Sequence, residues 1–367
     1  MIIKTSEAVF KGHPDKVCDQ IADGLLDVLL SHDKDSRVAI ECLIKDNFVV
    51  IAGEVTSNYS IDYAKETKRI LEEIGYTDEF EIIVKVSQQS NDIKIGVDNL
   101  GAGDQGIMYG YATDETKECL PLSYVLSRNI AKRMDEVNRQ NPTIFGLDGK
   151  CQVSMVYEGD KAHHISTVVV NAQTKPGISR EEYELYILEV LEEVLPSDLT
   201  DINTLVLINP TGEFVTGGPN ADSGVTGRKL QVDSYGTLVL HGGGAYSGKD
   251  YTKVDRSGAY FARYVAKAVV RAKLATSCRV SLAYAIGVPF PVMVDVKAQN
   301  SQFSNDELRK IINKVFDFAP YNIIKELKLK EQKYYPLAAY GHFGNKDYPW
   351  EEISDEVISK LIEASNS

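Results

Sequence analysis

Apolar residues recur along the first hundred positions at spacings that change from helical to alternating. From Pro14, a residue favoured in the first turn of a helix, apolar side chains at helical spacing predict a helix over residues 14–31. The elements predicted after it are strands at 38–44 and 48–55, a helix at 61–74 that Gly75 ends, and a strand at 81–86. The predicted order is therefore α-β-β-α-β.

The same order is predicted twice more along the chain. The second copy consists of a helix at 122–137, strands at 152–157 and 165–172, a helix at 181–194 and a strand at 205–208. The third copy consists of a helix at 257–272, strands at 280–286 and 292–296, and a helix at 306–316. Its last strand is not visible in the pattern. The copies share no sequence identity, so either a true repeat or the common alternation of α+β proteins explains the order.

Short connections between neighbouring strands favour mixed or antiparallel sheets with helices on one face. We therefore expect an α+β protein of three similar α-β-β-α-β units. The boundaries fall in glycine-rich stretches near residues 100 and 217, which gives an N-terminal unit (1–100), a middle unit (101–217) and a C-terminal unit (218–367).

Composition narrows the class of protein. The 367 residues are 43% hydrophobic and 25% charged, which is ordinary for globular domains, and the net charge of −13 disfavours nucleic acid or membrane partners. The sequence has no apolar run of about 18 residues and no apolar signal core near Met1. Its five cysteines form no C-x-x-C pair, which favours reduced thiols and a cytoplasmic location.

Glycine is concentrated in two stretches. Residues 212–258 hold 11 of the 27 glycines, and residues 101–110 hold four more. Such loops let a ligand approach main-chain N–H groups, and interleaved Lys, Arg and Asp suit phosphates and metal ions. The match to G-x-G-x-x-G at 101–106 lacks the flanking strand and helix of a dinucleotide site. Gly248-Lys249 nearly completes a P-loop, but Asp250 stands where the hydroxyl residue belongs, so only phosphate contact by Lys249 is expected.

Three charged groups lie in or near these loops. At the predicted helix start, His13, Asp15 and Lys16 supply a donor, a metal-ligand carboxylate and a cation where a helix N-terminus attracts anions. The other two groups are Asp222 with Arg228-Lys229, and Lys249 with Lys253, Asp255 and Arg256. A solvated charged face is the alternative for each. Since Mg²⁺ takes carboxylates together with phosphates, Asp15 and Asp255 are candidate ligands.

Six motifs, in order along nearly the whole chain, together resemble the S-adenosylmethionine synthetase family. They are GHPDK at 12–16, GAGDQG at 101–106, INPTG at 208–212, TGRK at 226–229, HGGGAYSGKD at 241–250 and AYGHFG at 339–344. The resemblance implies three α+β units around a pseudo-three-fold axis. It also implies a homodimer or a dimer of dimers (a homotetramer), with each active site shared between two subunits.

The reaction implied by the resemblance has two steps, assisted by two Mg²⁺ ions and a K⁺. The sulfur of L-methionine attacks C5′ of ATP and displaces the triphosphate, which is then hydrolysed to phosphate and pyrophosphate. A neutral thioether needs no general base, so the first step depends on in-line placement and on stabilising the charge of the leaving oxygen.

The resemblance assigns roles to individual residues. His13 donates to the leaving oxygen, and the triphosphate is neutralised by Lys150, Arg228, Lys229 and Lys249, with Arg228 also orienting it for hydrolysis. Asp15 and Asp255 hold Mg²⁺, and Glu41 holds K⁺. The amino-acid end of methionine is held by Glu54, Gln89, Asp222 and Lys253, with Asp104 beside the sulfur and ribose. Phe214 stacks on adenine, with Asp148, Asp222 and Ala245 also near ATP.

The sequence departs from the family pattern at Phe10-Lys11, at Glu213, and in a short stretch at 90–100 where the family has a gating loop. Two other functions remain as alternatives. An ATP-dependent small-molecule kinase would share the glycines, lysines and carboxylates but would release ADP. A catalytically inactive paralogue is disfavoured because His13, Asp15, Lys249 and Asp255 are all present.

Overall fold

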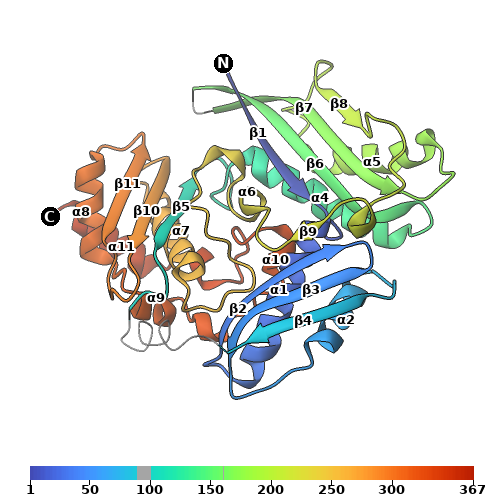
Figure 1. Cartoon of the computed structure of the whole chain (residues 1–367). Coiled ribbons are helices and arrows are strands. Elements are labelled where there is room, and N and C mark those ends of the chain that lie inside the picture. Colours follow the sequence, from blue (N-terminus) through green and yellow to red (C-terminus); the bar gives the residue numbers. More distant parts are fainter. Residues whose placement is uncertain (89–100, 160) are drawn as a thin grey trace.

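The computed structural model describes residues 1–88, 101–159 and 161–367. Three groups of strands form three lobes in Figure 1, one blue, one green and one orange, each with its own helices. The α+β class predicted from the sequence is confirmed.

The blue lobe contains a four-stranded sheet in the order β4-β3-β2-β9. Its strands are β2 (Arg37–Lys45), β3 (Phe48–Thr56), β4 (Glu81–Ser87) and β9 (Gly224–Val225), and its helices are α1 (Pro14–His32) and α2 (Tyr63–Ile74). β2 pairs antiparallel with β3, and β3 pairs parallel with β4. The alternate residues Val38, Ile40, Cys42 and Ile44 of β2 are buried in the core that α1 enters.

The green lobe contains the sheet β1-β6-β7-β8. Its strands are β1 (Ile2–Val9), β6 (Phe145–Glu158), β7 (Lys161–Thr174) and β8 (Leu205–Ile208), and its helices are α4 (Leu122–Gln140) and α5 (Arg180–Val194). Phe10 is fully buried in this lobe's core, and a Cβ at Gly149 would stand 2.1 Å from its ring. The unusual residue at position 10 therefore serves packing.

The orange lobe contains a three-stranded antiparallel sheet, β11-β10-β5. Its strands are β5 (Gly106–Thr113), β10 (Ser277–Tyr284) and β11 (Met293–Gln299), and its main helices are α7 (Val254–Arg271) and α8 (Asn305–Val315). Gly110 of β5 lets α7 approach closely, since a Cβ there would stand 1.9 Å from the carbonyl carbon of Ala262. Shorter helices are α6 (Leu230–Asp233), α9 (Pro320–Glu326), α10 (Leu337–Tyr340) and α11 (Asp355–Ser365), and single 3₁₀ turns lie at Gly218–Asn220, Gly236–Leu238, Leu329–Glu331 and Pro349–Glu351.

Each sheet includes one strand from elsewhere in the chain. β1 comes before the blue lobe in the sequence but pairs with β6 of the green lobe. β5 comes before the helices of the green lobe but pairs with β10 of the orange lobe. β9 comes before α7 of the orange lobe but pairs with β2 of the blue lobe. The α-β-β-α-β prediction contained none of these three strands. It also left open a last strand of the third copy, and among residues 300–367, all described, the structure has none.

Within the described residues, the buried apolar side chains form two clusters. One belongs to the green lobe, whereas the other runs continuously through the blue and orange lobes and includes both α1 and α7. The two helix N-termini that carry predicted site residues are therefore fixed in one shared core.

Candidate active site

The first turn of α1 presents a histidine and an aspartate side by side. His13 is the N-cap, and its Nδ1 accepts a hydrogen bond from the N–H of Asp15 at 3.2 Å. The Asp15 side chain is 1% exposed and accepts a hydrogen bond from the N–H of Val225 at 2.9 Å. Because Val225 ends β9, the pairing of β9 with β2 holds Asp15 against the turn that follows.

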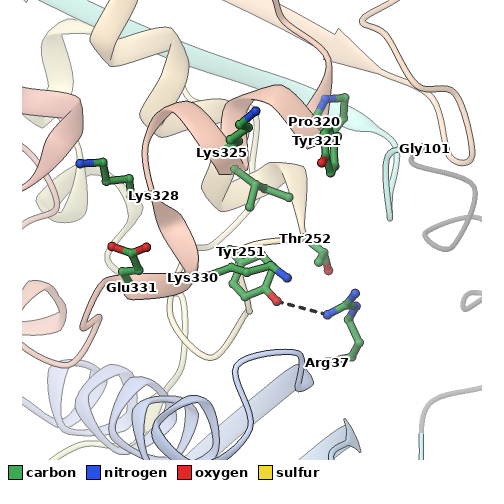
Figure 2. Close-up of a pocket in the computed structure, with 11 residues that line it drawn as sticks. Arg37, Gly101, Tyr251, Thr252, Pro320, Tyr321, Lys325, Lys328, Lys330 and Glu331 are labelled. Carbon is green, nitrogen blue, oxygen red and sulfur yellow. Dashed lines mark hydrogen bonds between the residues drawn. The ribbon is translucent and has the colours of Figure 1, made fainter.

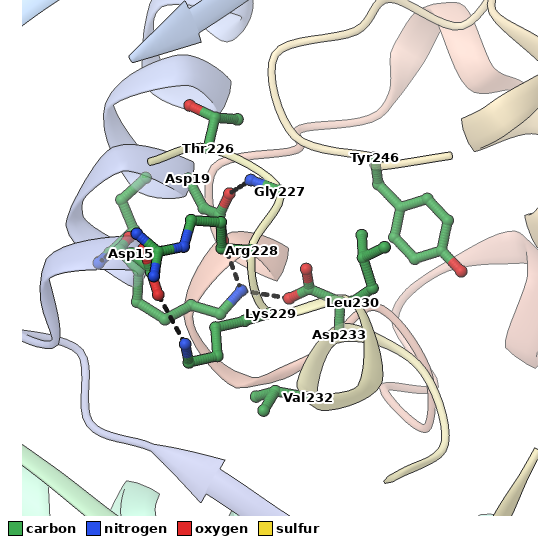
Figure 3. A network of polar contacts seen from close by, with 12 residues as sticks. Asp15, Asp19, Thr226, Gly227, Arg228, Lys229, Leu230, Val232, Asp233 and Tyr246 are labelled. Atoms are coloured by element: carbon green, nitrogen blue, oxygen red, sulfur yellow. Dashed lines mark hydrogen bonds and ion pairs between the residues drawn. The ribbon is translucent and has the colours of Figure 1, made fainter. Parts of the chain in front are cut away.

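That turn carries two cations that meet Asp15 (Figure 3). Lys229 Nζ lies 2.6 Å from Asp15 Oδ2, and Arg228 Nε lies 3.6 Å from Asp15 Oδ1. Although burial opposes it, the hydrogen bonds from Lys229 and Val225 hold the pKa of Asp15 below its ordinary value. A cavity of about 320 Å³ is lined by Glu7, Gly227, Arg228, Lys229, Leu230, Gln231, Val232, His241 and Gly243. Its size suits part of a small ligand.

His13 is neutral at physiological pH. Burial, and then the charge of Lys229, lower the pKa of His13 to about 4. Since Nδ1 already accepts a hydrogen bond, the single ring proton lies on Nε2. The result is an oriented N–H donor, the kind of group that stabilises charge developing on an oxygen atom.

Four further predicted residues lie in this region, which we call the α1 cluster. Lys150 and Asp222 are close enough for their charges to act on His13, and Lys150 Nζ lies 2.8 Å from Glu7. Asp148 accepts a hydrogen bond from the N–H of Gly218 at 2.8 Å, and burial raises its pKa to about 6. Gln173 links Asp148 to the segment that carries Phe214. Its side chain accepts a hydrogen bond from Asp148 N at 3.2 Å and donates one at 2.9 Å to the carbonyl of Val215, the residue after Phe214.

A second cluster lies at the start of α7. Lys249 Nζ lies 2.6 Å from Oδ2 of Asp255, which is in the first turn of α7. Gly248 precedes Lys249 with φ +80°, and a Cβ there would stand 2.0 Å from the carbonyl oxygen of Ile40. Glycine therefore brings Lys249 against β2, where it forms an isolated bridge with Ala39.

Glu41 and Glu54 join this α7 cluster from the exposed face of the blue sheet. Glu41 lies opposite Ala52, and Glu54 lies opposite Ala39, so the two glutamates are on one face two residues apart along the ladder. Burial raises the pKa of Glu41, whereas the charge of Lys249 lowers it. Lys249 is thus within electrostatic reach of Glu41 as well as Asp255.

The remaining predicted residues are more scattered. Lys253 pairs with the buried Asp250, which also accepts from Val38 N at 2.7 Å. Asp104 is exposed, and its carboxylate accepts from the adjacent Gln105 N at 2.7 Å. Ala245 belongs beside the α1 cluster, because a Cβ at Gly227 would stand 2.6 Å from that of Ala245. Gln89 and the short stretch at 90–100 lie outside the described residues.

The carboxylates fit a metal ion only in combination with a ligand. Within the described ranges no group of three or more His, Cys, Asp or Glu side chains could hold a metal ion alone. Asp15 and Asp255 each present carboxylate oxygens beside a lysine at a loop rich in N–H donors. This donor set fits Mg²⁺, which binds one or two carboxylates and completes its shell with phosphate oxygens and water.

A larger cavity than the one beside Arg228 lies elsewhere (Figure 2). It measures about 600 Å³ and is lined by Arg37, Gly101, Tyr251, Thr252, Pro320, Tyr321, Ile324, Lys325, Lys328, Lys330 and Glu331. None of the predicted site residues lines it, although Thr252 adjoins Lys253. Sequence reasoning missed a different set of residues, the buried aspartates Asp19 and Asp23, although their four-residue spacing from Asp15 is visible in the sequence.

Comparison with known proteins covers almost the whole chain. Family models described as the N-terminal, central and C-terminal domains of S-adenosylmethionine synthetase match residues 1–95, 99–214 and 216–352. The chain is 46% identical to the S-adenosylmethionine synthase of Clostridium tetani, over 98% of this chain and 99% of that one. It is 45% identical to the S-adenosylmethionine synthase of Thermus thermophilus, over 98% of both chains. Among the described residues, no helix is long and apolar enough to cross a membrane.

Proposed function

This chain belongs to the S-adenosylmethionine synthetase family and makes S-adenosylmethionine from L-methionine and ATP, and from this premise we propose how its residues act. The observation that carries the proposal is the oriented His13 donor at the N-terminus of α1, near Lys229 and next to Asp15, which both Arg228 and Lys229 approach. The relatives from Clostridium tetani and Thermus thermophilus are both named as synthases, which favours neither the kinase nor the inactive-paralogue alternative.

In the first step, the methionine sulfur attacks C5′ of ATP and the C5′–O bond breaks, leaving the triphosphate. His13 Nε2–H donates a hydrogen bond to the oxygen on which negative charge gathers, and this charge is larger in the transition state than in bound ATP. Because the pKa of His13 is low, the residue donates without changing its protonation state.

Cationic side chains from both clusters hold the triphosphate. Arg228, Lys229 and Lys150 act from the α1 cluster, and Lys249 acts from the α7 cluster. Arg228 is 48% exposed, and among the described residues it forms one long ion pair with Asp15 and a hydrogen bond to Ser223 O at 3.3 Å, so much of its planar fork is available to orient the triphosphate for hydrolysis to phosphate and pyrophosphate.

The family uses divalent metal ions and K⁺. In this chain we assign two Mg²⁺ ions per active site to Asp15 and Asp255, and K⁺ to Glu41. The bound cations supply further charge neutralisation for the phosphate oxygens. Lys229 pairs with Asp15, and Lys249 pairs with Asp255. These two lysines are therefore positioned to contact the same phosphate oxygens as the bound cations.

The remaining residues are proposed to contact adenine, the rest of ATP and methionine. Phe214 stacks on adenine beside Asp148 and Ala245, and Asp222 lies near ATP and the methionine amino group. The methionine end is completed by Glu54, Gln89 and Lys253, with Asp104 near the sulfur and ribose.

We also propose that a second copy of the chain completes each site. Among the described residues, no hydrogen bond or ion pair joins the α1 cluster (His13, Asp15, Asp148, Lys150, Phe214, Asp222, Arg228, Lys229) to the α7 cluster (Glu41, Glu54, Lys249, Asp255). A homodimer or dimer of dimers in which the two clusters come from different subunits would bring them onto one ATP. Three units (1–100, 101–217 and 218–367) around a pseudo-three-fold axis, and a cytoplasmic location, are part of the same proposal.

A product assay tests this function. With ATP, L-methionine, Mg²⁺ and K⁺, we expect S-adenosylmethionine together with equal amounts of phosphate and pyrophosphate. Formation of ADP would instead indicate a kinase, and no turnover would indicate an inactive paralogue. Mixing His13→Ala chains with Lys249→Ala chains tests sharing, because mixed dimers regain one intact site only if the two clusters act across subunits.

A further inference from the structure

α1 carries a row of four aspartates on its packed side. Asp15, Asp19, Asp23 and Asp27 recur every fourth residue, so they follow one another along one stripe of the helix. The first three are at most 1% exposed, and Asp27 is half-buried. An amphipathic helix normally turns its charged residues to water, so a buried acidic row must have partners.

Those partners are main-chain N–H groups of distant segments. Asp19 accepts from Gly227 N at 2.8 Å, and Asp23 accepts from Gly248 N at 2.9 Å. Asp27 accepts from Tyr334 N at 2.8 Å and from Tyr335 N at 2.9 Å. The middle two aspartates thus hold the residue directly before Arg228 and the residue directly before Lys249.

The hold of Asp19 on the Arg228–Lys229 turn is reinforced by a buried ion network (Figure 3). Lys16 Nζ lies 2.9 Å from Asp19 and also pairs with Asp233. Gly227 and Asp233 bracket the two cations, so α1 fixes this segment at both ends.

Asp23 holds the α7 cluster in place in the same way as Asp19 holds the Arg228–Lys229 turn. Besides accepting from Gly248, it pairs with the buried Arg256 of α7. Arg256 also donates to the carbonyl of Tyr246, two residues before Gly248. One carboxylate of α1 therefore fixes both the loop that ends at Lys249 and the helix that bears Asp255.

We propose that Asp19 and Asp23 are positioning residues for adenosyl transfer and triphosphate hydrolysis. They act on the triphosphate only through the main chain: Asp19 sets the place of Arg228 and Lys229, and Asp23 sets the place of Lys249. This inference rests on the proposed function of those three cations. Asp27 is a natural control, because it lies in the same row but holds Tyr334 and Tyr335, which have no proposed role.

The test compares alanine variants of the row in the full-length protein. Asp19→Ala leaves Lys16 paired with Asp233, so no buried charge is left without a partner. Small misplacements of catalytic groups cost up to about 100-fold in rate. We expect Asp19→Ala and Asp23→Ala to weaken binding of inorganic triphosphate with Mg²⁺ at least tenfold by calorimetry and to lower kcat about 100-fold. Asp27→Ala is expected to lose thermal stability but to keep triphosphate affinity and kcat.

Conservative variants separate position from stability. Asp19→Asn and Asp23→Asn keep an acceptor oxygen for Gly227 and Gly248 and are expected to restore most of the triphosphate affinity. Should an alanine variant not fold, Asp19→Glu or Asp23→Glu keeps the charge but moves the acceptor by one methylene, and a loss of affinity is again expected.

The comparison is made between variants that lose the same amount of melting temperature. The proposal is overturned if, under this condition, the Asp19 and Asp23 variants bind triphosphate as tightly as Asp27→Ala does. Wild-type protein is assayed in parallel. Wild type that forms no S-adenosylmethionine would refute the proposed function itself, whereas active wild type with unaffected row variants would refute only the positioning role.

Discussion

The first turns of α1 and α7 each carry an aspartate that pairs with a lysine, but the two aspartates differ in burial and in the number of their contacts. At each start an aspartate of the first turn meets a lysine from a glycine-rich segment at 2.6 Å. The side chain of Asp15 is 1% exposed and has three partners, Val225 N, Lys229 and Arg228, whereas that of Asp255 is 11% exposed and, within the described part of the chain, pairs with Lys249 alone. The same carboxylate–lysine pair is therefore held by more contacts at α1, and it is slightly more exposed and has fewer contacts at α7.

Because of this difference, variants at the two aspartates can separate an effect on the stability of the fold from an effect on metal binding. Replacing Asp15 removes the acceptor of a buried N–H as well as a proposed metal ligand, and an unpaired buried donor costs about 1–3 kcal/mol. Replacing Asp255 removes little besides the proposed ligand. Asp255 is thus the cleaner probe of metal binding, and His13 is the cleaner probe of the chemical step.

The largest effect is expected at His13. His13→Ala should lower adenosyl transfer about 100- to 1,000-fold, because a single donor to a developing oxyanion has that value elsewhere. ATP affinity should remain, since Arg228, Lys229 and Lys150 are untouched. Single-turnover kinetics and equilibrium ATP binding measure the two quantities. Replacement of the exposed His163 serves as the control, and unchanged transfer in His13→Ala would remove this residue from the mechanism.

The comparison is sharpened by Asp15→Asn and Asp255→Asn. Both should raise the Mg²⁺ concentration required for half-maximal activity by about tenfold or more. Only Asp15→Asn should also lower the melting temperature clearly, because the charge it removes is 1% exposed and pairs with both Lys229 and Arg228, whereas Asp255 pairs with Lys249 alone among the described residues. Asp355→Asn alters another first-turn aspartate, on α11, and should change neither quantity. Equal melting temperatures of the two variants would contradict the proposed difference between the helix starts.

A smaller effect is expected for Arg228, which is 48% exposed and, among the described residues, forms one long ion pair, with Asp15. Arg228→Leu should slow triphosphate hydrolysis about tenfold more than adenosyl transfer, because orientation of the triphosphate matters more after the C5′–O bond has broken. Separate assays with inorganic triphosphate and with ATP plus methionine give the ratio. Arg180→Leu, which removes an exposed pair with Glu184, is the control. Equal slowing of both steps would mean that Arg228 only binds ATP.

The elements with strong local patterns were predictable, and those that depend on distant partners were not. Pro14 and the apolar spacing after it located α1, and Gly75 located the end of α2. β9 contains two residues and exists because β2 supplies its partner, so no local pattern indicates it. β1 and β5 likewise pair with strands more than 100 residues away.

The candidate site shows the same division. Residue types and glycine spacing identified the loops that carry Arg228 and Lys249, whereas the assignment of single residues such as Glu41 relied on family resemblance. The pairing of Lys229 with Asp15 across 214 positions is a property of the fold. The acidic row of α1 is visible as a spacing of four, but its role depends on main-chain partners more than 200 residues away, Gly227 and Gly248, which no local pattern indicates.

The smallest expected effect concerns Asp148 and pH. Burial raises its pKa from an ordinary 3.8 to about 6, so the folded protein binds this proton more tightly than the unfolded chain. The associated stability is fully present below about pH 4 and is lost as pH rises through about 6. Asp148→Asn removes the cost of the buried charge and keeps an acceptor for Gly218 N. The variant should therefore gain melting temperature relative to wild type at pH 8, and gain less at pH 5. Asp306→Asn, at an exposed position, should show no such trend, and a gain that is larger at pH 5 would contradict the raised pKa.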